Sequence, residues 1–122
     1  MLLPRLRLKF LEDLQIDEYI SVNFAGAELK ETWKLARTTN NEVEVGTPTA
    51  IPGEISATNF VFSFNLDFNS LGLTVTQNAR FVTIVSSNPA FLFTDFLTNT
   101  SAVSGIIDDI DVDISDIVLT DI

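Results

Sequence analysis

The N-terminal part of the chain alternates between apolar and polar residues with a period of two, which is typical of strands that have one buried face. Residues 5–11 alternate three apolar side chains with three basic ones: Leu6, Leu8 and Phe10 with Arg5, Arg7 and Lys9. Residues 19–24 alternate in the same way, and Ala25-Gly26 ends that stretch. We therefore predict two half-buried strands, 5–11 and 19–24.

Residues 28–37 fit two patterns. In a helix Trp33 shares a face with Leu29, whereas in a strand it shares a face with Leu35. A polar turn, TTNN, and a strictly alternating stretch, EVEV, follow directly. Because strands explain both the residues before the turn and the alternating stretch after it, we predict a strand–turn–strand hairpin across residues 31–45.

The segment 54–70 is rich in Phe and also fits two periods. Apolar residues occupy every second position from Phe60 to Phe68, as in a strand. Phe60, Phe64 and Phe68 also recur at helical spacing. Propensity favours a strand, since Phe, Val, Ser and Asn are mediocre helix formers. The residues alone leave this choice open.

Residues 73–85 alternate on both sides of a polar turn and predict a β-hairpin. We expect Leu73 and Val75 of its first strand and Phe81 of its second strand to point inward. A further short strand is predicted at 91–96.

The C-terminal part begins with a polar loop, expected at 97–105, and ends in the acidic segment 106–122, which alternates apolar residues with Asp. Roughly seven or eight short strands and at most one helix follow from the whole pattern. Residues 1–122 therefore predict a single, mainly β domain, a β-sandwich or curved antiparallel sheet, with an acidic C-terminal strand or arm over 106–122.

The composition narrows the chemistry. The 122 residues include no His and no Cys, which excludes Ser-His-Asp and Cys-His catalysis, thiolate or imidazole metal sites and disulfides. Hydrophobic residues make up 46% of the chain and ten residues are Phe, which fits a folded domain rather than a disordered chain. We expect no catalytic residues and no cofactor.

The net charge of −10 is unevenly distributed. Residues 1–37 are balanced, whereas residues 38–122 carry a large acidic excess and one base, Arg80. This argues against binding to nucleic acid or to anionic lipid. No stretch approaches the roughly 20 apolar residues of a membrane span, and we expect no membrane association. The basic residues of strand 5–11 form either a solvated face or a dock for an acidic partner surface.

Two groups of acids are candidate sites. Asp109, Asp111 and Asp113 could hold a divalent ion weakly if they share one face of a strand, but the glycine and glutamate of a calcium-binding helix–loop–helix are missing. We expect instead a charged sheet face or edge. Three other acids lie next to turns and could supply the carboxylate pair of a glycosidase, although no spacing singles them out: Glu42, Glu44 and Glu54.

The aromatic residues give the strongest positive indication of function. Trp33 and Tyr19 could stack on a sugar ring, but a core position for Trp33 fits its apolar surroundings better. The Phe-rich run has more apolar surface than one face can bury, so part of it should meet a neighbouring subunit. The predicted interface residues come from this run: Phe60, Phe62, Phe64, Leu66 and Phe68.

About half of the chain resembles a module of bacteriophage tail and other virion proteins. A segment like ATNF…FNLDFN at 57–69 is a helix there, and a hairpin like LTVT…FVTIVS at 73–86 follows it. The stretch from Trp33 to Gly46 is similar to the hairpin that precedes this helix. The resemblance implies a helix near 55–69, a location in the virion after assembly in the host cytoplasm, and partners that are copies of the chain or other virion proteins.

The leading hypothesis is therefore a non-enzymatic structural subunit of a multi-copy assembly, a virion or tail component. The alternative is a β-sandwich binding module for a carbohydrate or protein ligand, which predicts an exposed Trp33. A small carboxylate-dependent hydrolase is a third hypothesis and predicts a cleft with two facing acids.

Overall fold

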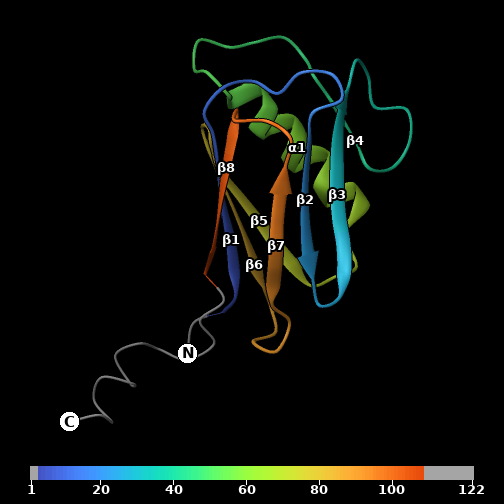
Figure 1. Cartoon of the computed structure of the whole chain (residues 1–122), viewed down its shortest axis with the longest axis vertical. Coiled ribbons are helices and arrows are strands. Elements are labelled where there is room, and N and C mark those ends of the chain that lie inside the picture. Colours follow the sequence, from blue (N-terminus) through green and yellow to red (C-terminus); the bar gives the residue numbers. More distant parts are fainter. Residues whose placement is uncertain (1–2, 109–122) are drawn as a thin grey trace, which may run out of the picture.

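The computed structural model describes residues 3–108, which form two packed sheets and one helix (Figure 1). In this part of the chain the elements are β1 (Arg5–Phe10), β2 (Tyr19–Phe24), β3 (Ala27–Lys34), β4 (Glu42–Glu44), α1 (Glu54–Asp67), β5 (Leu73–Asn78), β6 (Phe81–Ser86), β7 (Phe93–Thr98) and β8 (Val103–Asp108). The first sheet has the strand order β5-β6-β1-β8 and the second β4-β3-β2-β7. The predicted fold class, mainly β with one short helix, is confirmed.

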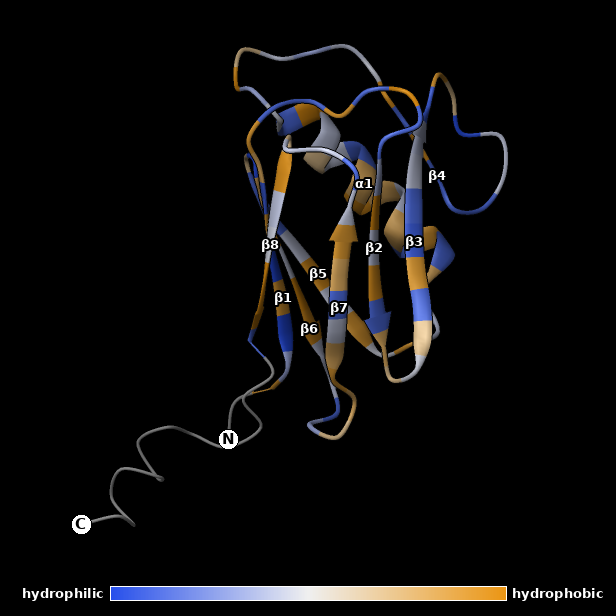
Figure 2. Cartoon of the chain, viewed as in Figure 1, coloured by the Kyte–Doolittle hydropathy of each residue, from blue (hydrophilic) through white to orange (hydrophobic). Residues whose placement is uncertain are grey.

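The alternating apolar residues of the N-terminal strands form part of the core. Leu6, Leu8 and Phe10 of β1 are buried, while their basic neighbours point outward. Figure 2 shows the same alternation of hydrophilic and hydrophobic residues along several strands. The strands predicted at 5–11 and 19–24 are confirmed, and the β2–β3 turn at Ala25-Gly26 has positive φ angles of 51° and 85°. Such a two-residue turn matches the twist of the strands that it joins.

Helix α1 closes the open side of the sandwich. The edge strands β7 and β8 contact each other on one side, and α1 contacts both of the opposite edge strands, β4 and β5. The helix therefore covers the core where the two sheets separate. The helix expected near 55–69 is confirmed.

Aromatic side chains connect α1 to both sheets. Phe60 of the helix stacks on Trp33 of β3, with ring centroids 6.1 Å apart and planes 5° from parallel. The ring of Phe60 also lies 5.8 Å from that of Phe10 and 5.2 Å from that of Phe64. All four rings are buried, so the apolar area that they remove from water anchors the helix on the sandwich.

The start of α1 requires a glycine. Gly53 has a φ of 82°, and a Cβ atom at this position would lie 2.0 Å from the carbonyl oxygen of Phe10. One turn later the buried hydroxyl of Ser56 accepts a hydrogen bond of 2.8 Å from the backbone N–H of Leu14. Small residues therefore allow the helix to approach the backbone that follows β1 closely.

Three details of the strand prediction are wrong. The hairpin expected across 31–45 does not form, because β4 returns beside β3 in parallel, pairing Trp33 with Val43. Phe81 points outward, since Val75 pairs directly with Ile84 and the inward face of β6 is therefore the other one. The loop expected at 97–105 is interrupted by the end of β7 and the start of β8.

The acidic strand or arm expected over 106–122 is described only as far as Asp108, where β8 ends. The rest of this predicted element lies outside the described residues.

The two neighbouring aromatics Phe60 and Phe62 should differ in their effect on stability. We expect Phe60→Ala to lower the free energy of unfolding by about 3–5 kcal/mol, because it leaves a cavity against Trp33. Phe62→Ala should change it by less than about 0.5 kcal/mol, because that side chain is exposed. Urea denaturation of the two variants measures the difference. Equal losses would contradict the assignment of Phe60 to the core.

Candidate functional site

The outer face of α1 carries exposed apolar side chains. The inner face buries Ser56, Ala57, Phe60, Ser63 and Phe64. One turn apart on the opposite side, Phe62 is 63% exposed and Leu66 is 52% exposed. We call these two residues the α1 apolar strip. Because the inner face of the helix is fixed by the core, the strip is held rigidly at the surface.

A groove of about 250 Å³ lies beside the strip, between α1 and the segment around β4. Its lining consists of one aromatic and four polar or charged residues: Phe62, Ser63, Asn59, Arg37 and Glu44. The amide of Asn59 donates a hydrogen bond of 2.9 Å to the backbone carbonyl of Glu44 and so ties the helix to β4. The groove combines an apolar wall with hydrogen-bonding groups, which is the usual composition of a ligand or partner site.

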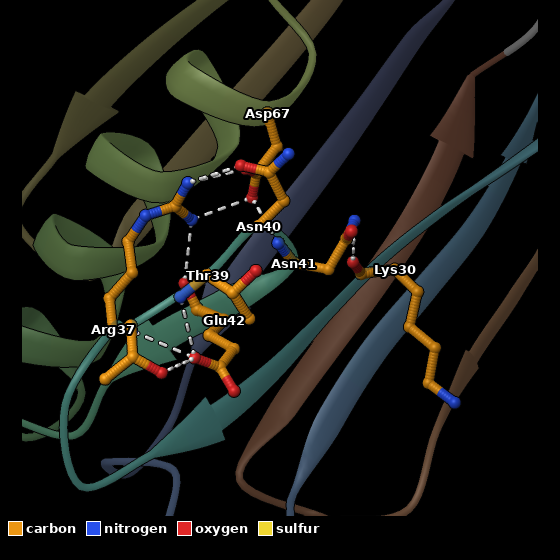
Figure 3. Close-up of polar contacts among 8 residues, drawn as sticks. Lys30, Arg37, Thr39, Asn40, Asn41, Glu42 and Asp67 are labelled. Atoms are coloured by element: carbon orange, nitrogen blue, oxygen red, sulfur yellow. Dashed lines mark hydrogen bonds and ion pairs between the residues drawn. The ribbon is translucent and has the colours of Figure 1, made fainter.

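Arg37 is positioned by the last residue of the helix (Figure 3). Its two terminal nitrogens lie 2.6 and 2.9 Å from the carboxylate oxygens of Asp67, in a bidentate ion pair. The backbone N–H of Asn41 donates a further hydrogen bond of 3.0 Å to the same carboxylate. A carboxylate at a helix C-terminus is unfavourable by itself, and Arg37 supplies the compensating positive charge.

A second carboxyl group, that of Glu31, is buried next to this ion pair. Glu31 is 1% exposed and faces inward from β3 between Leu29 and Trp33. Neither of its carboxyl oxygens has a hydrogen-bond donor among the described residues. Burial, and then the proximity of the Asp67 carboxylate, raise the pKa of Glu31 to about 10.

The carboxyl groups of Glu31 and Asp67 therefore differ in protonation. Glu31 keeps its proton at neutral pH and can donate it toward Asp67. Burial of Asp67 favours its neutral form, but the hydrogen bonds from Arg37 and from the backbone of Asn41 help to outweigh this effect, and the pKa of Asp67 is lowered to about 2. Protonated Glu31, ionised Asp67 and the guanidinium of Arg37 thus form a compact cluster without an unpaired charge.

The loop that follows β3 is held by a second carboxylate. Glu42 accepts hydrogen bonds from the backbone N–H groups of Thr38 and Thr39 and from the hydroxyl of Thr38, at 3.0 to 3.1 Å (Figure 3). The Thr38 contacts lower the pKa of Glu42 below its usual value. This folded loop turns the chain back so that β4 can run parallel to β3.

The predicted interface residues fall into two groups. Phe60 and Phe64 belong to the domain's own core, and Phe68 is half-buried against it, so these rings serve the fold. Only Phe62 and Leu66 are presented to the surroundings. The surplus apolar surface that is predicted for the Phe-rich run is therefore confined to the α1 apolar strip.

The sugar-stacking role considered for Trp33 does not fit its position. Trp33 is fully buried beneath α1, as the core interpretation predicts. Tyr19 is half-buried, and the ammonium group of Lys30 lies 4.4 Å from the centre of its ring.

Two of the three acids that are candidates for catalysis make structural contacts. Glu42 holds its loop, and Glu54 accepts a hydrogen bond of 2.9 Å from Thr49. Glu44 is the single carboxylate that lines the groove beside α1. The facing carboxyl pair Glu31 and Asp67 is sealed inside the protein and has no access to a substrate.

The metal candidates Asp109, Asp111 and Asp113 lie outside the described residues. Within residues 3–108 no group of three metal-ligating side chains comes together.

Sequence reasoning missed the cluster of Glu31, Arg37 and Asp67. A signal was present for Glu31: once Trp33 is placed inward on a strand, the period of two places Glu31 inward as well. The contact with Asp67 joins residues more than thirty positions apart, and no local pattern indicates it.

Comparisons with known proteins identify no relative. No family model, no curated protein and no solved structure matches this chain. In the described part of the chain, no helix combines the length and apolarity needed to cross a membrane.

The raised pKa of Glu31 makes stability depend on pH. Between its ordinary pKa of 4.5 and about 10 the folded state holds a proton that the unfolded state releases. The free energy of unfolding therefore falls as pH rises through this range, by up to about 1.4 kcal/mol per pH unit. Glu31→Gln keeps a neutral side chain of the same shape and should flatten this slope.

Urea denaturation at about pH 6, 7.5 and 9 tests this expectation. The variant should gain stability relative to the native chain as pH rises. Glu28→Gln, which changes an exposed residue of the same strand, is the matched control and should keep the native slope. Parallel curves for the native chain and Glu31→Gln would show that Glu31 is not held protonated.

Proposed function

We propose that this chain is a non-enzymatic structural subunit of a multi-copy assembly and that the α1 apolar strip is a contact with a neighbouring copy. The observation that carries the proposal is the exposure of Phe62 and Leu66 on a helix whose other face is fixed in the core. Burying a large apolar side chain contributes about 1.5–3 kcal/mol, so two on a rigid surface favour association.

We further propose that the assembly is a bacteriophage virion or tail, and that the partners are copies of this chain or other virion proteins. The order of α1 followed by the β5–β6 hairpin agrees with the module that the sequence resembles. The parallel pairing of β3 and β4 departs from it, because a hairpin is expected at that place. The net charge of −10 also suits a virion component that must not bind nucleic acid through its phosphates.

A binding module for a carbohydrate or protein ligand is the second candidate. The groove beside α1 supports it, since Phe62 offers an apolar surface next to Asn59 and Arg37. In this candidate the strip is one wall of a ligand site, and the chain stays monomeric at all concentrations.

Removal of the strip tests the assembly proposal. We expect the native chain to form oligomers whose mass rises with concentration in light scattering. Phe62→Ser with Leu66→Ser should weaken this association about tenfold or more, because the apolar area buried at the contact is lost.

The control removes two exposed apolar side chains elsewhere, those of Ile16 and Leu97. Ile16→Ser with Leu97→Ser should leave the association unchanged. A native chain that stays monomeric over the whole range would overturn the proposal and favour the binding module.

A further inference from the structure

The outer face of the first sheet carries a row of cations on an otherwise acidic protein. Arg5, Arg7 and Lys9 of β1 point outward at every second position, and they are three of the seven bases of the chain. The neighbouring outward residues of β5 and β6 are uncharged. On β8, Asp108 pairs with Arg7 at 2.5 Å. The face therefore has a net positive charge.

Apolar side chains flank this row and form a groove of about 220 Å³. Phe81 of β6, 50% exposed, stands on one side of β1 and Ile106 of β8, 57% exposed, on the other. The ammonium group of Lys9 lies 5.7 Å from the centre of the Phe81 ring. The groove thus has a cationic floor between two apolar walls, and its charge suits an extended segment with an acidic residue at every second position.

The chain itself contains such a segment. Residues 109–122 hold five Asp and no base, and Asp109, Asp111 and Asp113 alternate with Ile110, Val112 and Ile114. In an extended chain, alternate side chains recur at about 7 Å, which is also the spacing of alternate side chains along β1. We propose that the segment 109–122 of a second copy binds across the outer face of β1, with its three Asp carboxylates over Arg5, Arg7 and Lys9.

The same segment of the chain's own copy is poorly placed for this contact. In the antiparallel pairing of β8 with β1, Asp108, the last described residue, lies beside Arg5 at one end of the cationic row. To return over β1 the chain would need a turn of about two to five residues directly after Asp108. That turn would use Asp109, and a turn of three or more residues would use Asp111 as well, so at most two of the three carboxylates could meet the row.

This contact does not involve the α1 apolar strip. It rests on the proposed function in one respect only, which is that copies of the chain associate. It adds a surface at which one copy contributes the acidic residues and the other the basic ones. Because the contact is ionic and exposed, its affinity should fall as salt is added, unlike that of an apolar contact.

Charge reversal at matched ends of the two rows tests the proposal in the full-length chain. One variant carries Arg5→Glu and Lys9→Glu, which spares the Arg7–Asp108 ion pair. The other carries Asp109→Lys and Asp113→Lys. These end positions face each other whichever way the segment runs. Both pairs are placed in a Phe62→Ser background, so that loss of the α1 contact and loss of this one are measured separately.

Sedimentation velocity should show association of the Phe62→Ser chain that weakens about tenfold or more in each reversed variant. Mixing the two variants should restore it, because the reversed face of one meets the reversed segment of the other. A chain carrying all four reversals should also associate. Lys30→Glu with Lys34→Glu, on the outer face of the other sheet, is the control and should associate like the Phe62→Ser chain.

Two results would overturn the proposal. Variants that associate as well as the Phe62→Ser chain would show that these charges make no contact. Rescue in the four-reversal chain without rescue on mixing would show that the segment binds its own copy. Circular dichroism of each variant establishes that the fold is retained, which is expected because all of the reversed residues of β1 lie on its outward face.

Discussion

The stacking of Phe60 on Trp33 is the contact on which the rest of the structure depends. It holds the single helix of the described chain against the second sheet, and the contact of Phe60 with Phe10 joins the helix to the first sheet, at the side where the edge strands β4 and β5 separate. Without this contact the sandwich would expose its core there. The same contact fixes which way α1 is rotated, and this rotation leaves Phe62 and Leu66 outside.

The cluster of Glu31, Arg37 and Asp67 fixes the C-terminal end of the helix. Asp67 carries the negative charge, Glu31 keeps the proton, and Arg37 brings the loop after β3 onto α1. Removing one member would leave a buried group unpaired, which costs more than the net stabilisation that the cluster provides. This cluster is therefore best understood as a constraint on how the loop and the helix fit together.

The domain presents two surfaces of different character. The α1 apolar strip offers burial of apolar area, whereas the outer face of β1 offers positive charge between apolar walls. They lie on different elements, so both can be occupied at once. In the proposed assembly, two distinct contacts would allow one copy to join more than one neighbour.

The sequence by itself determined the elements whose two faces differ strongly. The alternation of β1 and β2 and the turn residues around β5 and β6 fixed these strands, since period and turn chemistry are local properties. The sequence also indicated that the Phe-rich run carries surplus apolar surface. The helical spacing of this run, together with the resemblance to a virion module, predicted the helix.

Only the tertiary structure decided which residues of that run are exposed. Phe60 and Phe62 are the same residue type two positions apart, and the position of Trp33 separates their roles. The parallel pairing of β4, the outward Phe81 and the buried Glu31 were likewise settled by partners distant in the sequence. Local patterns limit what a segment can form, but the choice among those forms depends on long-range packing and charge.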